Sequence, residues 1–347
     1  MSSRSKILIF RFSALGDVAM TVPVIWSLLQ QYPEHDIVFV SRPFAQKFFT
    51  PIARVQFVSV DFGGKHKGLK GLYQLFKRLR ELGPYKMVAD LHGVLRSYVL
   101  GAMFRLTGAK VLCIDKGRQD KKALCAKENK QLVQLKPTFE RYRDVFIKAG
   151  MNFPLVGFPG RDIYNADADT VPHSALNNRG AKIGVAPYAK HQWKMWPIEK
   201  MHRLVEILDG KGYQVFLFGG RGEEEATLEE WASEFVNVHC LAGQLSMDEE
   251  LKAIANLDLM VSMDSANMHL ASLVETPVVS VWGATHPYAG FYGWGQKPDN
   301  AVQIDLECRP CSVFGNKPCF RGDFACMESV TVEMIEARIE QIVSLKN

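Results

Sequence analysis

The loop after the first apolar run carries a carboxylate that could take part in catalysis. Asp17 follows the run 6–12, and Gly16 before it permits a tight turn from a strand into a helix. A carboxylate at the start of a helix is electrostatically favoured, so Asp17 can act as a general base or can simply cap the helix. The residue types leave both roles open.

A second polar segment, 264–269, reads Asp-Ser-Ala-Asn-Met-His and lies between an apolar run and an amphipathic helix. Asp264 and Ser265 can cap that helix, and the backbone N–H groups at its start form a binding site for an anion such as a diphosphate. Lys194 lies just before Pro197, which suits the first position of another helix, so its ammonium can contact a phosphate bound there. These residues favour a diphosphate ligand.

Polar residues also follow two other predicted strands. His92 and Arg96 come after 87–90. The guanidinium of Arg96 can hold a phosphate or carboxylate, although a solvated arginine at a helix start is the simpler alternative. Thr285 follows the predicted strand 277–282. Ligands of such folds bind in a crevice beyond the carboxyl ends of the strands, and we expect Thr285 and the segment 264–269 to flank the same crevice. No strand is followed by the dinucleotide-binding or P-loop pattern, so those signatures are excluded.

Short apolar runs alternate with longer amphipathic segments along the chain, which predicts parallel sheets covered by helices on both faces. The predicted strands are 6–12, 36–40, 56–60, 87–90, 110–114, 182–187, 214–218, 236–240, 257–262 and 277–282. The clearest predicted helices are 69–82, 197–210, 223–234, 247–256, 266–274 and 331–345. The fold class is therefore α/β, with two doubly wound, Rossmann-like units in succession.

A segment without sustained periodicity, 158–180, is rich in Gly, Pro, Asn and Asp and is predicted to link the two units. We expect an N-terminal domain over 1–165, a C-terminal domain over 166–330, and a helix within 331–347 that packs across one of the domains. A chain of 347 residues is long enough to bury two such cores.

Charge is distributed unevenly between the two predicted domains. Residues 1–165 carry 27 Lys and Arg against 12 Asp and Glu, whereas 166–347 carry 15 against 25. The strongly basic first half predicts an anionic partner, which could be nucleic acid, a phosphorylated glycolipid or an acidic membrane surface. The stretch 116–130 is particularly basic, and it is either a loop near an anionic substrate or solvated surface.

Composition and segment order exclude several protein classes. Hydrophobic side chains make up 47% of the chain and charged ones 23%, which suits a globular protein rather than collagen, a coiled coil or a disordered chain. No apolar run approaches the length of about 18 residues that a membrane span needs. The N-terminus leads into a predicted strand rather than a signal peptide, so we expect a cytoplasmic protein.

Four of the seven cysteines, Cys308, Cys311, Cys319 and Cys326, are grouped near the C-terminus. A short loop can gather four thiolates around a structural zinc ion, although the spacing is irregular compared with paired C-x-x-C knuckles. A structural loop with reduced thiols is the alternative. Any zinc bound there is expected to be remote from catalysis.

Six segments follow one another between residues 11 and 327: RFSALGDVAMTVP, DLHGVLRS, a Lys-x-Trp-Pro segment, MDSANMHLASL, VWGATHP and the cysteine-rich end. In this combination and order they resemble glycosyltransferase family 9, the lipopolysaccharide heptosyltransferases. The resemblance implies a GT-B fold, two Rossmann-like domains facing across a cleft, and inverting sugar transfer without a required metal or other cofactor. It also implies a nucleotide-sugar donor, usually ADP-heptose, in the C-terminal domain and an anionic, lipid-linked oligosaccharide acceptor in the N-terminal domain.

The resemblance implies roles for particular residues. Asp17 matches the family's general base, Lys194 its diphosphate-binding lysine and Asp264 its donor-binding acid. The other candidates on the donor side are Ser265, Asn267, Met268, His269 and Thr285, and those on the acceptor side are Ser13, Gly16, His92 and Arg96.

Two other functions are alternatives. A nucleotide-sugar 2-epimerase of GT-B fold would use acids in the donor cleft and would need no macromolecular acceptor. A non-catalytic protein that binds zinc or nucleic acid would show strongly salt-dependent affinity. The basic stretch 116–130 lacks the interleaved aromatic residues on which single strands stack, so we expect no nucleic-acid partner. We expect instead a transferase peripherally associated with the inner face of the cytoplasmic membrane, whose acidic surface suits the basic half.

Overall fold

The chain folds into two compact units. The computed structural model describes residues 4–165 and 171–345. The N-terminal unit comprises Met1–Gly117 and Lys136–Phe158, and the C-terminal unit comprises Arg118–Leu135 and Pro159–Asn347. Each unit has its own sheet and its own hydrophobic core.

This division differs from the predicted boundary at residue 165 in one long segment. Residues 118–135 belong to the C-terminal unit. The cause is an apolar cluster in which Leu124 and Leu135 pack with Ala289 and Phe291. The segment therefore crosses into the second unit and the chain then returns to the first.

The predicted linker 158–180 is structured at its start. Helix α8 (Gly160–Tyr164) buries Tyr164 and contacts α11 (Met247–Ala255) of the C-terminal unit. The unit boundary accordingly falls between Phe158 and Pro159. The part of the predicted linker at 166–170 lies outside the described residues.

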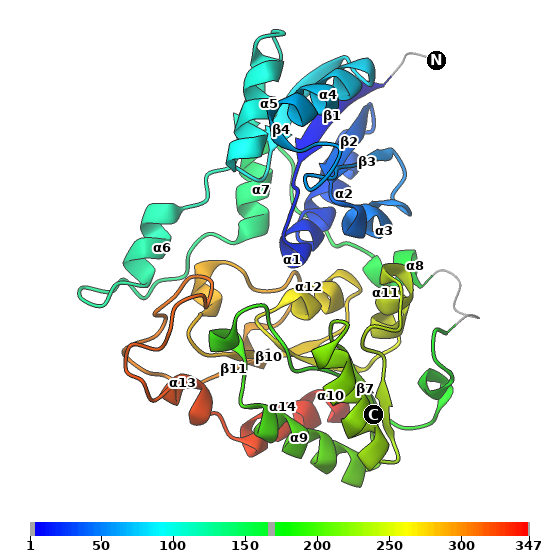
Figure 1. The fold of residues 1–347 in the computed structure, drawn as a ribbon, viewed down its shortest axis with the longest axis vertical. Helices are drawn as coiled ribbons and strands as arrows, with labels where there is room; N and C mark the ends of the chain where they lie inside the picture. Colours follow the sequence, from blue (N-terminus) through cyan, green and yellow to red (C-terminus); the bar gives the residue numbers. More distant parts are fainter. Residues whose placement is uncertain (1–3, 166–170, 346–347) are drawn as a thin grey trace. The chain divides into compact units, whose positions relative to one another are not determined.

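The N-terminal unit is built on a parallel sheet of five strands in the order β3-β2-β1-β4-β5. The strands are β1 (Ser5–Phe10), β2 (His35–Ser41), β3 (Val55–Ser59), β4 (Tyr85–Asp90) and β5 (Val111–Cys113). The helices are α1 (Leu15–Ala19), α2 (Val22–Gln31), α3 (Gln46–Phe49), α4 (Gly68–Glu81), α5 (Leu95–Arg105) and α7 (Thr138–Ile147). Helices α4 and α5 pack together against one face of the sheet, and α7 packs with α2 (Figure 1). Alternate side chains of the strands, such as Leu8 and Phe10, point to one face of the sheet and pack against Leu75 and Phe104 of the helices.

The C-terminal unit has a parallel sheet of six strands in the order β11-β10-β9-β6-β7-β8. The strands are β6 (Lys182–Ala186), β7 (Gln214–Leu217), β8 (Val238–Cys240), β9 (Leu259–Met263), β10 (Val278–Trp282) and β11 (Ala301–Gln303). Its remaining helices are α6 (Arg118–Leu124), α9 (Ile198–Gly210), α10 (Glu223–Glu234), α12 (Ala266–Leu273), α13 (Ala325–Glu328) and α14 (Val332–Ser344). None of the helices in residues 4–165 and 171–345 has the length and apolar character that crossing a bilayer requires.

The ten predicted strands are all present, and their ends differ from the predicted ones by at most two residues. Strand β11 was not predicted. Helix α9 begins at Ile198, so Pro197 precedes the helix instead of taking its first position. The α/β fold class with two Rossmann-like units is confirmed.

Each sheet reverses its strand order once. The reversal lies between β1 and β4 in the N-terminal unit and between β9 and β6 in the C-terminal unit. In doubly wound sheets, ligands bind outside the carboxyl ends of the strands at this reversal. The loops after β1 and β4 therefore form one candidate region, and the loops after β6 and β9 form the other.

The predicted C-terminal helix forms as α14 and is part of the C-terminal core, beside α9 (Figure 1). Ile335 and Ile339 of this helix are fully buried. We therefore expect Ile339→Ala to lower the free energy of unfolding of the C-terminal unit by about 2 to 5 kcal/mol, because it leaves a cavity. Urea denaturation followed by tryptophan fluorescence measures this. Met334→Ala, on the exposed side of the same helix, is the control, and equal midpoints for the two variants would contradict this packing.

Candidate functional site

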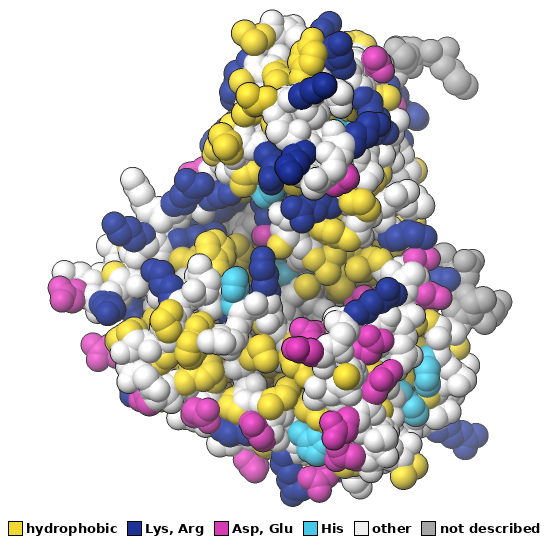
Figure 2. All heavy atoms as spheres, viewed as in Figure 1, with side chains coloured by type: hydrophobic (Ala, Val, Ile, Leu, Met, Phe, Trp, Pro, Cys, Tyr) yellow, Lys and Arg dark blue, Asp and Glu magenta, His cyan; other side chains and the backbone are white. Residues whose placement is uncertain are grey.

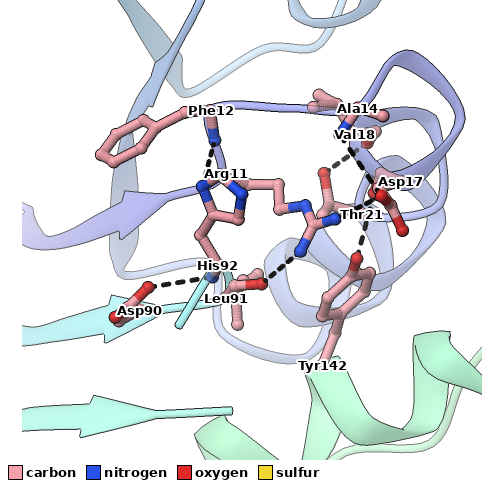
Figure 3. Close-up of polar contacts among 10 residues, drawn as sticks. All are labelled: Arg11, Phe12, Ala14, Asp17, Val18, Thr21, Asp90, Leu91, His92 and Tyr142. Atoms are coloured by element: carbon pink, nitrogen blue, oxygen red, sulfur yellow. Dashed lines mark hydrogen bonds and ion pairs between the residues drawn. The ribbon is translucent and has the colours of Figure 1, made fainter. Parts of the chain in front are cut away.

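The predicted base Asp17 forms an ion pair at the strand reversal of the N-terminal unit. Arg11 follows β1 directly, and its Nη2 lies 2.5 Å from Oδ2 of Asp17 (Figure 3). The Arg11 side chain is only 8% exposed, whereas that of Asp17 is 29% exposed. The guanidinium is therefore part of the interior, and the carboxylate that it holds is accessible to a reactant.

Two further elements fix the position of Arg11. Its Nη1 donates to the carbonyl oxygen of Leu91, just after β4, at 3.0 Å. The guanidinium also lies over the ring of Tyr142 in α7, and the Tyr142 hydroxyl donates to the carbonyl oxygen of Asp17 at 3.2 Å. Contacts from β1, β4 and α7 thus hold the Arg11–Asp17 pair in one place (Figure 3).

The neighbouring His92 is neutral at physiological pH. Its Nδ1 accepts a hydrogen bond from the backbone N–H of Phe12 at 3.3 Å, so the proton of the neutral ring is on Nε2. Burial, reinforced by the charge of Arg11, lowers the pKa of His92 to about 3. The carboxylate of Asp90, buried at the end of β4, accepts from the backbone N–H groups of His92 and Gly93 and shapes this loop. His92 can therefore donate a hydrogen bond to a ligand but is not the base.

The other residues predicted on the acceptor side lie around this pair. Asp17 is at the third position of α1 rather than at the cap, and its Oδ2 accepts from the backbone N–H of Ala14. It thus stabilises the helix start and pairs with Arg11 as well. Ser13 is half-buried and Gly16 is buried in the same loop. Arg96 is exposed on α5, and its guanidinium lies over the ring of Phe62.

The C-terminal unit carries a second ion pair at its own strand reversal. Nζ of Lys194, in the loop after β6, lies 2.8 Å from Oδ2 of Asp264, directly after β9. The Lys194 side chain is 16% exposed and that of Asp264 is 7% exposed. Here the carboxylate is the more buried partner, and the ammonium is the one nearer the solvent.

The start of α12 beside this pair is open to an anion. Ser265 occupies the cap position, but its hydroxyl lies 3.2 Å from that of Ser262 and makes no hydrogen bond that caps the helix. The capping by Asp264 or Ser265 that the sequence suggested is therefore not made, since Asp264 pairs with Lys194 instead. The backbone N–H groups of the first turn are available for a ligand.

The remaining donor-side candidates differ in accessibility. Asn267 is half-buried in the first turn of α12, whereas Met268 is fully buried and His269 is nearly so. Thr285 is 1% exposed, and its hydroxyl has no hydrogen-bond partner in the described part of the chain. Its carbonyl oxygen accepts from Arg309. Asn267, like Ser265, is thus more accessible to a ligand than Met268, His269 and Thr285.

The four C-terminal cysteines line one narrow cavity of the C-terminal unit as free thiols. Burial raises the pKa of the Cys326 thiol to about 11. Within residues 4–165 and 171–345, no three His, Cys, Asp or Glu side chains are arranged to hold a metal ion. The arrangement gives the zinc alternative no support and is compatible with a reduced structural loop.

Three residues that take part in the contacts around Asp17 and His92 were not predicted as site residues: Arg11, Asp90 and Tyr142. One signal for Arg11 was present in the sequence, since a charged residue stands between Phe10 and Phe12 near the end of the run 6–12. Tyr142 had no such signal, because it is 125 positions away from Asp17 along the chain.

Comparison with known proteins identifies the family. The model of glycosyltransferase family 9 (heptosyltransferase) matches residues 72–317. Lipopolysaccharide heptosyltransferase 1 of Pseudomonas aeruginosa is 28% identical over 320 residues, which cover 88% of this chain and 86% of that protein.

Solved structures agree with this result. The E. coli heptosyltransferase WaaC with ADP has a TM-score of 0.71 at 22% identity, and the same enzyme with ADP-2-deoxy-2-fluoro heptose has 0.70 at 22%. In both cases the match covers 97% of this chain and 99% of the other. The likeness confirms the GT-B fold. The match to the family model and to curated heptosyltransferases, rather than this likeness, identifies a glycosyltransferase and excludes the epimerase and non-catalytic alternatives. Because the family model matches more than half of this chain, the chain belongs to glycosyltransferase family 9, the heptosyltransferases.

Proposed function

We propose that the protein transfers heptose from ADP-heptose to a lipopolysaccharide core acceptor with inversion, and that Asp17 is the general base. The observation that carries this proposal is the accessible carboxylate of Asp17, held by the buried Arg11 at a strand reversal. An inverting transfer needs a base that takes the proton of the acceptor hydroxyl as its oxygen attacks the anomeric carbon. A fixed carboxylate can accept that proton in the transition state.

The donor side of the proposal rests on Lys194 and the open start of α12. A departing diphosphate develops negative charge, which an ammonium and backbone N–H groups stabilise without a metal or other cofactor. The E. coli heptosyltransferase has been solved with ADP, and this favours the same nucleotide here. When Lys194 binds phosphate, the carboxylate of Asp264 is left to accept hydrogen bonds from hydroxyl groups of the donor.

The acceptor side of the proposal rests on the surface of the N-terminal unit. This unit carries 21 Lys and Arg against 9 Asp and Glu. Its helices α4 and α5 also expose Leu69, Tyr73, Leu95 and Tyr98, and Figure 2 shows hydrophobic side chains among Lys and Arg over these helices. A basic surface with exposed apolar and aromatic side chains suits the anionic face of a membrane, from which a lipid-linked acceptor is presented.

Lys194→Ala should weaken binding of ADP by about 1.5 to 3 kcal/mol, because it removes a charge-assisted contact to the diphosphate. Isothermal titration calorimetry with ADP, GDP and UDP measures the effect and tests the preference for adenine. The control is Lys190→Ala, which removes an exposed lysine of the same segment. Unchanged ADP affinity in the Lys194 variant would remove this residue from the diphosphate site.

Asp17→Asn should lower kcat by roughly 10²-fold to 10⁴-fold, because the amide keeps the shape of the side chain but cannot accept the proton. Transfer from ADP-heptose to heptose-deficient lipopolysaccharide measures kcat, and ADP binding should be unchanged. Asp36→Asn is the matched control, because Asp36 lies at the amino end of β2, whereas Asp17 follows the carboxyl end of β1. Near-normal turnover would reject Asp17 as the base, whereas loss of folding in this variant would assign it a structural role only.

A further inference from the structure

A basic cavity of about 580 Å³ lies inside the C-terminal unit, and neither Lys194 nor Asp264 is among the residues that line it. One wall comes from residues 118–135, which we call the strap, and the other from the loop 307–321. Its volume is in the range of ligand pockets, which is about 300 to 1,000 Å³. Neither the proposed base nor the proposed diphosphate site uses it.

The strap is firmly attached to the C-terminal unit. Besides the apolar cluster around Leu124 and Leu135, the backbone N–H of Leu135 donates to the carbonyl oxygen of Tyr288 at 2.9 Å. The ammonium of Lys121 lies 4.0 Å from the ring centroid of Phe291. The basic stretch predicted at 116–130 is thus attached to the C-terminal unit from residue 118 on, and its residues Cys125, Ala126, Lys127 and Lys130 line the cavity.

Four cationic side chains surround the cavity, against a single carboxylate, that of Glu307. Lys127 lies over the ring of Phe320 at 4.5 Å, and Lys317 is exposed on the opposite wall. Figure 2 shows Lys and Arg side chains gathered over α6 and the loop that follows it. Arg321, the fourth cation, pairs with Asp323 at 2.7 Å.

Lys130 is the most restricted of these cations. Its ammonium donates to the carbonyl oxygens of Glu307 and Arg309 at 2.8 and 2.9 Å, which leaves one of its three N–H groups for a ligand. Within the described residues, no carboxylate forms an ion pair with Lys127, Lys130 or Lys317. Burial lowers the pKa of Lys130, and a bound anion would offset that effect. The cavity therefore has positive charge that the protein itself does not neutralise.

We infer that this cavity binds an oxyanion, a phosphate or carboxylate group, carried by a sugar of the acceptor. The inference rests on the proposed function. The loop that supplies Lys317 also lies against the proposed donor site, because a Cβ added to Gly315 would collide with the side chain of Lys194. An acidic sugar bound here would lie on the loop that contacts the diphosphate-binding lysine. Lys127, Lys130 and Lys317 then select acceptors by their charge.

Protection of a thiol tests binding at this place without any need for activity. Cys125 lines the cavity, whereas Cys240 lies in β8 of the same unit. We expect glucose 6-phosphate or glucuronate to slow the modification of Cys125 by N-ethylmaleimide at constant ionic strength, and glucose to have no effect. Peptide mass spectrometry follows both thiols. Absence of protection at Cys125, or equal slowing at Cys240, would overturn the inference.

The variant Lys127→Gln/Lys317→Gln should abolish this protection, and Lys297→Gln, which removes an exposed lysine elsewhere in the unit, should preserve it. In transfer assays the double variant should raise the KM for a phosphorylated acceptor about tenfold or more, as expected for lost charge-assisted contacts. The KM for the same acceptor after phosphatase treatment, and the KM for ADP-heptose, should stay within about twofold.

The outcomes separate the two proposals. A raised KM for ADP-heptose would assign the cavity to the donor and overturn the inference. Equal losses with the phosphorylated and dephosphorylated acceptors, together with no protection of Cys125 by glucuronate, would also overturn it. A protein that transfers no heptose at all would contradict the proposed function, while protection of Cys125 by glucose 6-phosphate would still establish the oxyanion site.

Discussion

The reversal of strand order in each parallel sheet is the constraint on which both candidate sites depend. Because β4 lies beside β1, the residues after these strands meet, and Arg11 reaches the carbonyl oxygen of Leu91 from 80 positions away. Because β9 lies beside β6, Asp264 meets Lys194 in the same way. Helices cross over opposite faces of the sheet on either side of a reversal, so the loops there diverge and leave the ends of the strands accessible.

The two ion pairs have opposite exposure, and this difference suits different chemistry. In the N-terminal unit the cation Arg11 is the buried partner, so the carboxylate of Asp17 faces outward. In the C-terminal unit the carboxylate of Asp264 is the buried partner, so the ammonium of Lys194 faces outward. A base must present an accessible carboxylate, and a diphosphate site must present an accessible cation. In each pair the buried partner positions the exposed one.

Local patterns were sufficient to predict ten strands and six helices, because these depend on period, and to place the candidate site residues after strands. Asp17, Lys194 and Asp264 all follow apolar runs that form strands. Contacts distant in sequence could not be predicted in this way. Tyr142 reaches Asp17 from α7, and the strap joins the C-terminal unit through Leu124 and Leu135, whose partners lie more than 150 positions later. The residue types alone do not identify such partners.

The strap changes how the uneven charge of the chain is interpreted. It moves five cations out of the basic first half, so the C-terminal unit holds 21 Lys and Arg against 28 Asp and Glu. That unit is acidic overall, and much of the acid is in α10, which contains six glutamates. Screening limits exposed charges to a range of about 8 to 10 Å at physiological salt, so an anion responds to the charges around its cavity and only weakly to the rest of the unit. An acidic unit can therefore contain a site for an acidic sugar, because its lysines converge where its glutamates do not.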